Sequence, residues 1–290
     1  MALSPATGKE VLDSQRNEIT EHHIYMKLAQ AEKSTHNKGI LTKIAQDELE
    51  HYNFWKQYSG QEIEPDRWKI FKFYLIARVL GLTFGIKLME KGEENAQVTY
   101  TRIAGEIPEA QKIVEEEDSH EQELLNILNE EKLQYVGSMV LGMNDALVEL
   151  TGALAGLTLA LQNTHLIGLT GGITGIAASL SMAASEYLST KSEEGEKSPA
   201  KASLYTGGAY VITVLMLIFP YLIFSDYFVC LGIALFNSVV IILIFTFYVS
   251  IAQDVPFWKR FLEMAGISLG VACISFGIGF LVRHIFGIEV

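Results

Sequence analysis

Charge is scarce in the second half of this 290-residue chain. Residues 136–290 hold only 6 of the 22 Lys and Arg residues and 10 of the 34 Asp and Glu residues. A soluble domain carries charge on roughly a quarter of its residues, so a soluble fold is excluded for this half. Residues 1–135 hold the remaining 16 basic and 24 acidic residues. We therefore predict a water-soluble domain over residues 1–135 and a membrane domain over residues 136–290.

Cysteine pairs, an excess of basic charge and an apolar leader are also missing. The two cysteines, Cys230 and Cys273, lie far apart in apolar runs, which argues against a disulfide framework and a cysteine-based zinc site. The net charge of −12 disfavours a nucleic-acid binder, which needs clustered positive charge. Residues 1–21 are polar and acidic, without the apolar core of a signal peptide. We expect the amino-terminal domain to stay in the cytoplasm.

Five apolar stretches in the second half are long enough to cross a bilayer, which takes about 20 residues. Their approximate limits are 137–161, 166–189, 204–224, 227–251 and 264–286. The loops after the second and fourth stretches contain Lys or Arg, whereas the loops after the first and third contain neither. Because basic loops stay in the cytoplasm, these two loops and the amino terminus share that side, and the carboxyl terminus lies opposite. The sequence predicts an integral, multi-pass membrane protein.

Acidic side chains interrupt the first two of these stretches. Asp145 and Glu149 lie four residues apart in the first, and Met182 and Glu186 have the same spacing in the second, so each pair shares one helix face. An ionisable group in lipid costs roughly 2.5–3.5 kcal/mol, and such groups usually mark an ion or proton path. Carboxylates with a thioether suit a divalent transition metal, because sulfur is a soft ligand. Glu186 also has a plainer interpretation, since it lies near a helix end and could reach water.

In this half the sequence resembles the vacuolar iron transporter family. The resemblance covers residues 136–290 and is most specific in Gly-Met-Asn-Asp-Ala-Leu-Val at 142–148 and Ser-Met-Ala-Ala-Ser-Glu-Tyr-Leu-Ser at 181–189. It implies a homodimer that exchanges Fe²⁺, and often Mn²⁺, for protons and moves the metal out of the cytoplasm. By the same resemblance, Asp145 and Met182 are metal ligands in the translocation path.

The sequence departs from that family pattern in two places. Thr174 stands where a carboxylate is expected about two turns before Met182, and Glu149 could replace it. The acidic helical insert that plant members carry between the second and third spans has shrunk to residues 191–202. A cytoplasmic metal site elsewhere in the chain could take its place.

Residues 1–135 have the periodicity of helices, little proline and no run that resembles a strand. We predict helices over 8–33, 37–59, 67–104 and 108–133. The second and fourth carry Glu-x-x-His, at 48–51 and 117–120, whose two side chains project from one face and can ligate a common cation. The first and third carry Glu18 and Glu93. The order Glu, Glu-x-x-His, Glu, Glu-x-x-His is a twofold internal repeat, typical of two-metal sites in helical bundles.

This region resembles the erythrin or rubrerythrin branch of the ferritin-like superfamily. The resemblance implies an all-α protein in which a ferritin-like four-helix bundle, with a site for two iron ions, precedes the five-helix transmembrane domain. Carried over position by position, the implied ligands are Glu18, Glu48, His51, Glu93, Glu117 and His120, with Glu50 and Glu116 as neighbours. On the third helix, either Glu90 or Glu94 could be the ligand in place of Glu93.

Two functions fit these patterns. The first is export of divalent iron or manganese by exchange for protons, with Asp145, Glu149, Met182 and Glu186 along the path and a cytoplasmic iron-binding domain. The alternative is a membrane-anchored di-iron oxidase or peroxidase whose spans serve only as an anchor. Ferroxidase-like activity of the soluble domain is compatible with both. An anchor needs no acidic residues within the membrane, which favours the exporter.

The segment 68–87 is unusually apolar for a soluble bundle, yet it carries Lys69, Lys72, Arg78 and Lys87. It could be a sixth crossing, a membrane-surface helix attracted to anionic lipid, or the buried side of the third helix. Basic residues at these intervals argue against a crossing. We favour a helix that packs at a subunit or membrane interface.

Overall fold

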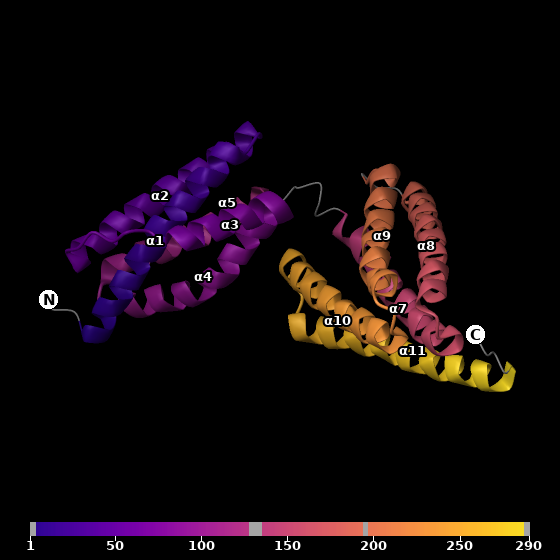
Figure 1. Ribbon diagram of the computed structural model, residues 1–290. Coiled ribbons are helices and arrows are strands. Elements are labelled where there is room, and N and C mark those ends of the chain that lie inside the picture. Colours follow the sequence, from indigo (N-terminus) through magenta and orange to yellow (C-terminus); the bar gives the residue numbers. More distant parts are fainter. Residues whose placement is uncertain (1–3, 128–134, 194–196, 287–290) are drawn as a thin grey trace. The chain divides into compact units, whose positions relative to one another are not determined.

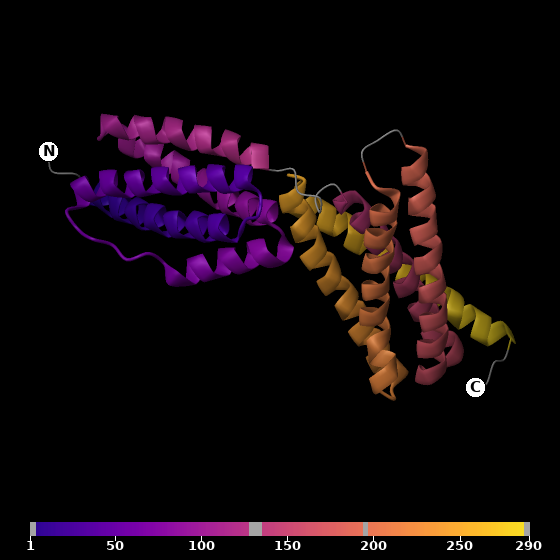
Figure 2. The same ribbon diagram turned by 90° about the horizontal axis from the view of Figure 1, so that it is seen from above.

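The computed structural model describes residues 4–127, 135–193 and 197–286, without the side chains at 6, 90, 92–98, 121, 122, 125–127 and 286. Its elements are helices, with no strand in these ranges (Figures 1 and 2), which confirms the prediction of an all-α protein. The chain divides into two compact units, Met1–Glu130 and Glu131–Val290. The predicted domain boundary, after residue 135, lies close to this division.

Three helices of the first unit begin at polar capping residues. The helices of this unit are α1 (Pro5–Ala31), α2 (Thr35–Ser59), α3 (Arg67–Leu80), α4 (Leu82–Ala104) and α5 (Gln111–Ile127), with a 3-10 turn, η1 (Pro108–Ala110), before α5. The side chains of Ser4, Ser34 and Asp66 accept hydrogen bonds from backbone N–H groups in the first turns of α1, α2 and α3. These caps satisfy donors that a helix start leaves unpaired, and they mark where α1, α2 and α3 begin.

The predicted helix over 67–104 is wrong in one respect, because it is broken at Gly81. This residue has φ 112° and ψ 150°, a conformation that glycine adopts without steric cost. The chain then folds back, and α4 packs on α3 so closely that a Cβ atom at Gly85 would lie 2.6 Å from the Cβ of Ala77. Helix α3 is thus a separate element that also packs against α1.

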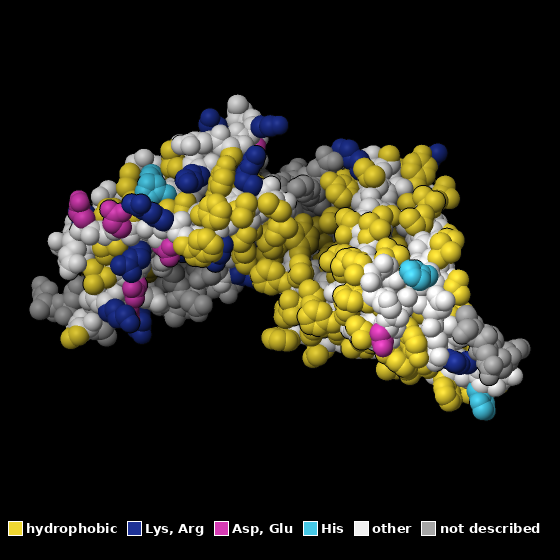
Figure 3. Space-filling view, in the orientation of Figure 1, with side chains coloured by type: hydrophobic (Ala, Val, Ile, Leu, Met, Phe, Trp, Pro, Cys, Tyr) yellow, Lys and Arg dark blue, Asp and Glu magenta, His cyan; other side chains and the backbone are white. Residues whose placement is uncertain are grey.

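The second unit contains the apolar helices of the chain. They are α7 (Val136–Leu161), α8 (Thr164–Ser192), α9 (Pro199–Ile223), α10 (Tyr227–Ala252) and α11 (Phe257–Phe286). All five are long and apolar enough to cross a membrane, as predicted, and hydrophobic side chains cover much of the visible face of this unit (Figure 3). Helix α7 packs against each of the other four. Gly279 of α11 lies so close to Gly156 of α7 that a Cβ atom on Gly279 would come within 2.2 Å of the Gly156 carbonyl oxygen.

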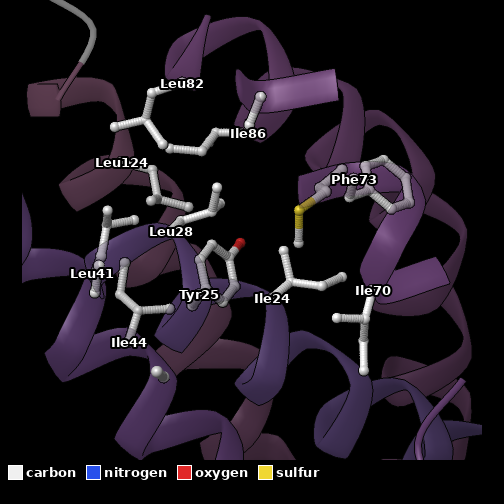
Figure 4. Packing of buried hydrophobic residues seen from close by; sticks show 14 residues of the cluster. Ile24, Tyr25, Leu28, Leu41, Ile44, Ile70, Phe73, Leu82, Ile86 and Leu124 are labelled. Atoms are coloured by element: carbon white, nitrogen blue, oxygen red, sulfur yellow. The ribbon is translucent and has the colours of Figure 1, made fainter. Parts of the chain in front are cut away.

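Two apolar clusters fill the first unit. The larger takes one or more side chains from every helix, including Ile24, Ile44, Phe73, Ile86 and Leu124 (Figure 4). The smaller surrounds the buried indole of Trp55 and includes Val11, Tyr100, Ile103 and Ile113. Burial of a side chain of this size contributes roughly 1.5–3 kcal/mol. The two clusters therefore hold α1, α2, α4 and α5 together at two levels along their length.

Candidate metal sites

A polar cluster lies between the two apolar clusters of the first unit. On α1, Glu18 stands between Val11 of the smaller cluster and Ile24 of the larger. On α2 and α5, each Glu-x-x-His motif has the same position, with one cluster before it and the other after it. The apolar packing on both sides thus turns the acidic side chains inward, toward one another.

Three helices bring four of the predicted ligands together. Glu18 of α1, Glu48 and His51 of α2 and Glu117 of α5 each offer one ligand atom, and these atoms all lie within 4.8 Å of one another. The first three residues are buried and Glu117 is partly buried. Carboxylates packed this closely repel one another unless protons or cations lie among them. The geometry is that of a site for a positive charge.

The two Glu-x-x-His motifs are arranged symmetrically around this site. Glu48 directs one carboxylate oxygen toward His51 Nδ1, at 3.5 Å, and the other toward His120 Nδ1, at 3.4 Å. Glu117 does the same, with distances of 3.2 Å to His51 Nδ1 and 3.7 Å to His120 Nδ1. Each carboxylate therefore lies between the two imidazoles, so both motifs could contribute ligands to one metal centre.

Several atoms that face this cluster lack hydrogen-bond partners. Glu18 Oε2, Glu48 Oε2, His51 Nδ1 and His120 Nδ1 are all buried, and none of them makes a hydrogen bond. Leaving a buried polar atom unpaired costs about 1–3 kcal/mol. Three of these atoms belong to the residues that converge on one site, and His120 Nδ1 lies 3.4 Å from Glu48 Oε1 at its edge. Unpaired buried donor and acceptor atoms of this kind fit metal coordination, because bound metal would satisfy them.

The outer nitrogen of each histidine is paired with a carboxylate from the opposite motif. His51 Nε2 lies 3.1 Å from Glu116 Oε2, and His120 Nε2 lies 3.0 Å from Asp47 Oδ2. A carboxylate at this position accepts a hydrogen bond from Nε2–H and so directs the Nδ1 lone pair toward the cluster. Glu116 was predicted as a neighbour of the ligands, whereas Asp47 was not. Glu50, the other predicted neighbour, is exposed.

Glu18 is held by two aromatic side chains. Tyr100 Oη and Trp55 Nε1 both donate hydrogen bonds to Glu18 Oε1, at 2.8 and 3.0 Å. This arrangement occupies one carboxylate oxygen and leaves the other directed toward His51 Nδ1, at 3.9 Å. Tyr100 comes from α4, so the fourth helix also contributes to the site.

The electrostatics of the cluster favour a bound cation. Burial, with Glu48 and Glu117 nearby, raises the pKa of Glu18 well above its usual range. Burial alone lowers the pKa of a histidine, but Glu117 and Glu48 outweigh it and raise the pKa of His51 to about 12 and that of His120 to about 10. Burial also opposes ionisation of Glu48, yet the two histidines lower its pKa to about 2. The cluster attracts positive charge, as protons or as metal ions.

The predicted ligand from the third helix stays a prediction. The backbone of α4 is helical through Glu90, Glu93 and Glu94, but these side chains lie outside the described residues. Glu93 precedes Tyr100 by seven residues, or two helical turns, on the same helix.

In the second unit, the acidic residues within the apolar helices contact hydroxyl groups. Tyr210 of α9 donates a hydrogen bond to Glu149 Oε2 at 3.0 Å, and Ser138 of α7 donates one to Glu186 Oε1 at 2.5 Å. Asp145 is partly buried, whereas Glu149 is exposed in a single chain. Neither Tyr210 nor Ser138 was predicted from the sequence as a partner, because a lone Ser or Tyr in an apolar helix has no distinctive spacing.

Met182 lies beside the same core as the acidic face of α7. Met182 of α8 and Met143 of α7 both pack against a buried cluster that contains Ala146, Leu147 and Tyr210. Within the described part of the chain, Asp145, Glu149 and Glu186 do not form a tight group of three ligands like that of the first unit. One chain thus brings these residues to neighbouring faces of α7, α8 and α9 without assembling a closed metal site.

Part of the chain is similar to a known protein family. Residues 136–196, which comprise α7, α8 and the start of the following loop, match the model of the VIT family. Neither the curated proteins nor the solved structures that were compared with the chain contain a match. Together with the five apolar helices, the family match supports an integral multi-pass membrane protein that transports metal ions.

Proposed function

We propose that this protein exports divalent iron from the cytoplasm in exchange for protons, and that its first unit is a ferritin-like iron-binding domain. The observation that carries the proposal is the acidic face of α7. Asp145 and Glu149 lie one helical turn apart in an otherwise apolar span, inside the region that matches the VIT family. Mn²⁺ is a further candidate cargo, because carboxylate and thioether ligands discriminate poorly between the two ions.

Carboxylates within the membrane provide a simple basis for exchange. A carboxylate holds either a proton or a metal ion, so one cation must leave before the other binds. Glu149 is oriented by its hydrogen bond from Tyr210, and this phenol can remain a donor while the carboxylate changes its cation. Asp145 lies one turn before Glu149, and Met182 supplies a sulfur atom from the neighbouring helix. In this scheme Glu186 is the most cytoplasmic of the four residues.

A second copy of the chain would complete the path. Glu149 is exposed although it lies in a span, and an exposed carboxylate in lipid is costly. A homodimer with twofold symmetry would enclose this residue between subunits. The basic loops after α8 and α10 support an orientation with the first unit in the cytoplasm and the carboxyl terminus on the opposite side.

The first unit fits a pair of iron ions. Glu18, Glu48, His51, Glu117 and His120, with Glu93 as the predicted sixth ligand, would hold them, and Asp47 and Glu116 would orient the histidines. When bound, such a pair of ions supplies redox chemistry toward O₂ or peroxide. The residues of the chain bind the ions, hold the histidine protons on Nε2 and exclude water by the two apolar clusters.

Metal flux into proteoliposomes tests the transport proposal. We expect Fe²⁺ uptake driven by a pH gradient to fall to the background of empty vesicles in the double variant Asp145→Asn, Glu149→Gln. Glu263→Gln is the matched control, because Glu263 is an exposed acidic residue on another apolar helix. Undiminished flux in the double variant would remove these residues from the path.

Oxidation of Fe²⁺ by the first unit is a second candidate function, favoured by Glu48 and Glu117, whose carboxylates each lie between the two imidazoles. We expect O₂- or peroxide-dependent oxidation by the full chain to be lost in Glu48→Gln and kept in the Asp145→Asn, Glu149→Gln variant. If flux is intact in Glu48→Gln while oxidation is lost, the two activities are separate. If the membrane variant moves iron normally and only oxidation depends on the chain, the spans serve as an anchor.

A further inference from the structure

Helix α3 presents an apolar stripe to solvent. Trp68, Phe71, Leu75 and Val79 follow one another at spacings of three, four and four residues and so share one helix face. They are 71%, 53%, 48% and 61% exposed, and we call these four residues the α3 stripe. In Figure 3, hydrophobic side chains gather over the position of α3 in the first unit.

The other face of α3 is already occupied. Ile70, Phe73 and Ala77 are buried in the larger apolar cluster of the first unit. The α3 stripe therefore takes no part in the apolar core of this unit. A contiguous apolar patch at the surface of a soluble domain usually marks a protein or membrane contact.

The charge of α3 differs from that of the unit around it. Residues 1–135 carry 24 acidic and 16 basic residues, a formal charge of −8, whereas α3 carries four basic residues and no acidic one. Lys69 turns inward to Glu21, with a distance of 2.9 Å between Nζ and the carboxylate. Arg67, Lys72 and Arg78 are exposed. Arg67 pairs with Glu64, at 3.3 Å, so Lys72 and Arg78 are the main cations beside the stripe. An apolar stripe with cationic flanks in an acidic domain is complementary to an anionic lipid surface.

We propose that α3 lies on the membrane surface, with the α3 stripe among the lipid headgroups and acyl chain ends and its basic side chains on anionic headgroups. Tryptophan favours this depth, because its ring is apolar while its N–H reaches water. Lysine and arginine bury their methylene stems and keep their charges at the headgroups. The lipid thus removes the apolar side chains of the α3 stripe from water without a protein partner.

The covalent connection favours lipid as the partner. Only eight residues separate Ile127, the end of α5, from Val136, the start of the first span, and they reach at most about 30 Å. The first unit therefore remains beside a bilayer at high effective concentration. Helix α3 itself does not cross, because its 14 residues extend about 21 Å, short of the roughly 30 Å of hydrocarbon.

A second copy of the chain fits the stripe less well. In a symmetric dimer through α3, the same surface of both copies would meet. Arg67, Lys72 and Arg78 of one copy would then face the same cations of the other, and like charges brought together at an interface are unfavourable. Lipid headgroups of opposite charge carry no such cost.

Spin labels in the full-length protein test the proposal. In a Cys230→Ser, Cys273→Ser background, single cysteines at Leu75 on the stripe and at Gln46 on the exposed face of α2 are labelled, and the protein is reconstituted in vesicles. We expect the label at 75 to be several-fold more accessible to O₂ than to a water-soluble nickel complex, and the label at 46 to show the reverse. The preference at 75 should be stronger with phosphatidylglycerol in phosphatidylcholine than with phosphatidylcholine alone.

Three results would overturn the proposal. The first is an equal, water-like response at 75 and 46. The second is a label at 75 shielded from both reagents and close to the label of a second copy in double electron–electron resonance, which would make the stripe an interface between chains. The third is an unchanged lipid preference at 75 in the variant Lys72→Glu, Arg78→Glu, because both side chains are exposed and their replacement leaves the core intact.

Discussion

Single residues determine how the polar cluster of the first unit would hold metal. The histidines of the two motifs are paired crosswise with the acidic residue that precedes the glutamate of the opposite motif, Asp47 for His120 and Glu116 for His51. The internal repeat thus extends one residue further than Glu-x-x-His. The repeat predicted that Glu18, Glu48, His51 and Glu117 come together. It did not predict the role of Asp47, because this residue pairs with His120, which is 73 residues away in the sequence.

Replacing Asp47 by Asn tests this pairing. The amide can donate to His120 Nε2, which would favour the tautomer with the proton on Nδ1, where a metal must bind. We expect metal affinity of the first unit to fall about 10- to 100-fold, as measured by competition with a chelator. Asp118→Asn is the control, because Asp118 is exposed on α5 close to the second motif. Equal affinity in both variants would show that Asp47 does not orient His120.

Metal binding should release protons. The pKa of His51 is raised to about 12 and that of His120 to about 10, so both are protonated at neutral pH without metal. We expect apparent affinity to rise with pH between about 6 and 8, about tenfold per pH unit for each proton released. Calorimetry in buffers of different ionisation enthalpy counts these protons, and a count of zero would contradict the assignment.

Without metal, the two histidines should make the folded state less stable as the pH rises, whereas the affinity for metal should increase. A histidine whose pKa is higher in the folded than in the unfolded state stabilises the fold fully below its unfolded pKa of about 6.5. This contribution is lost as the pH rises through about 10 and 12, the folded pKa values of His120 and His51. Thermal unfolding of the metal-free and metal-loaded protein from mildly acidic to alkaline pH compares the two trends.

Elements were predicted more reliably than their breaks. Apolar periodicity and length predicted every span, and the structure extends them at their ends, most of all for α11, which begins at Phe257 rather than 264. The break at Gly81 was missed because the segment before and after it is continuously apolar and lacks proline. Helix α3 ends before Gly81 because Gly85 packs closely on Ala77, and this contact forms only in the folded unit.

The crossing of α7 and α11 depends on two glycines in contact. Gly279→Val places side-chain atoms where the carbonyl of Gly156 lies, within 2.2 Å of the added Cβ. We expect overpacking to cost at least about 1–3 kcal/mol, seen as a lower midpoint in unfolding by sodium dodecyl sulfate. Gly277→Val, two residues away on the same helix and with nothing within 4 Å of its added Cβ, should unfold like the unmodified protein. A similar loss in both variants would refute the close crossing.

At the scale of the whole molecule, the chain joins a unit that contains a candidate metal site to a unit of five helices long and apolar enough to cross a membrane. The split of charge at residue 135 predicted a division of the chain into two parts, and the apolar stretches predicted the five helices that could cross a membrane. The exposure of Glu149 and the open arrangement of Asp145, Glu149 and Glu186 could not be predicted, because they depend on how α7, α8 and α9 pack.

The central claim is that carboxylates in α7 alternate between Fe²⁺ and protons. The most direct measurement follows luminal pH and luminal Fe²⁺ together in proteoliposomes. We predict that Fe²⁺ added outside acidic vesicles enters while the lumen becomes more alkaline, and that Glu149→Gln abolishes both signals in parallel while Glu263→Gln keeps both. Fe²⁺ entry at the same rate with and without a pH gradient, and without a change in luminal pH, would contradict the account.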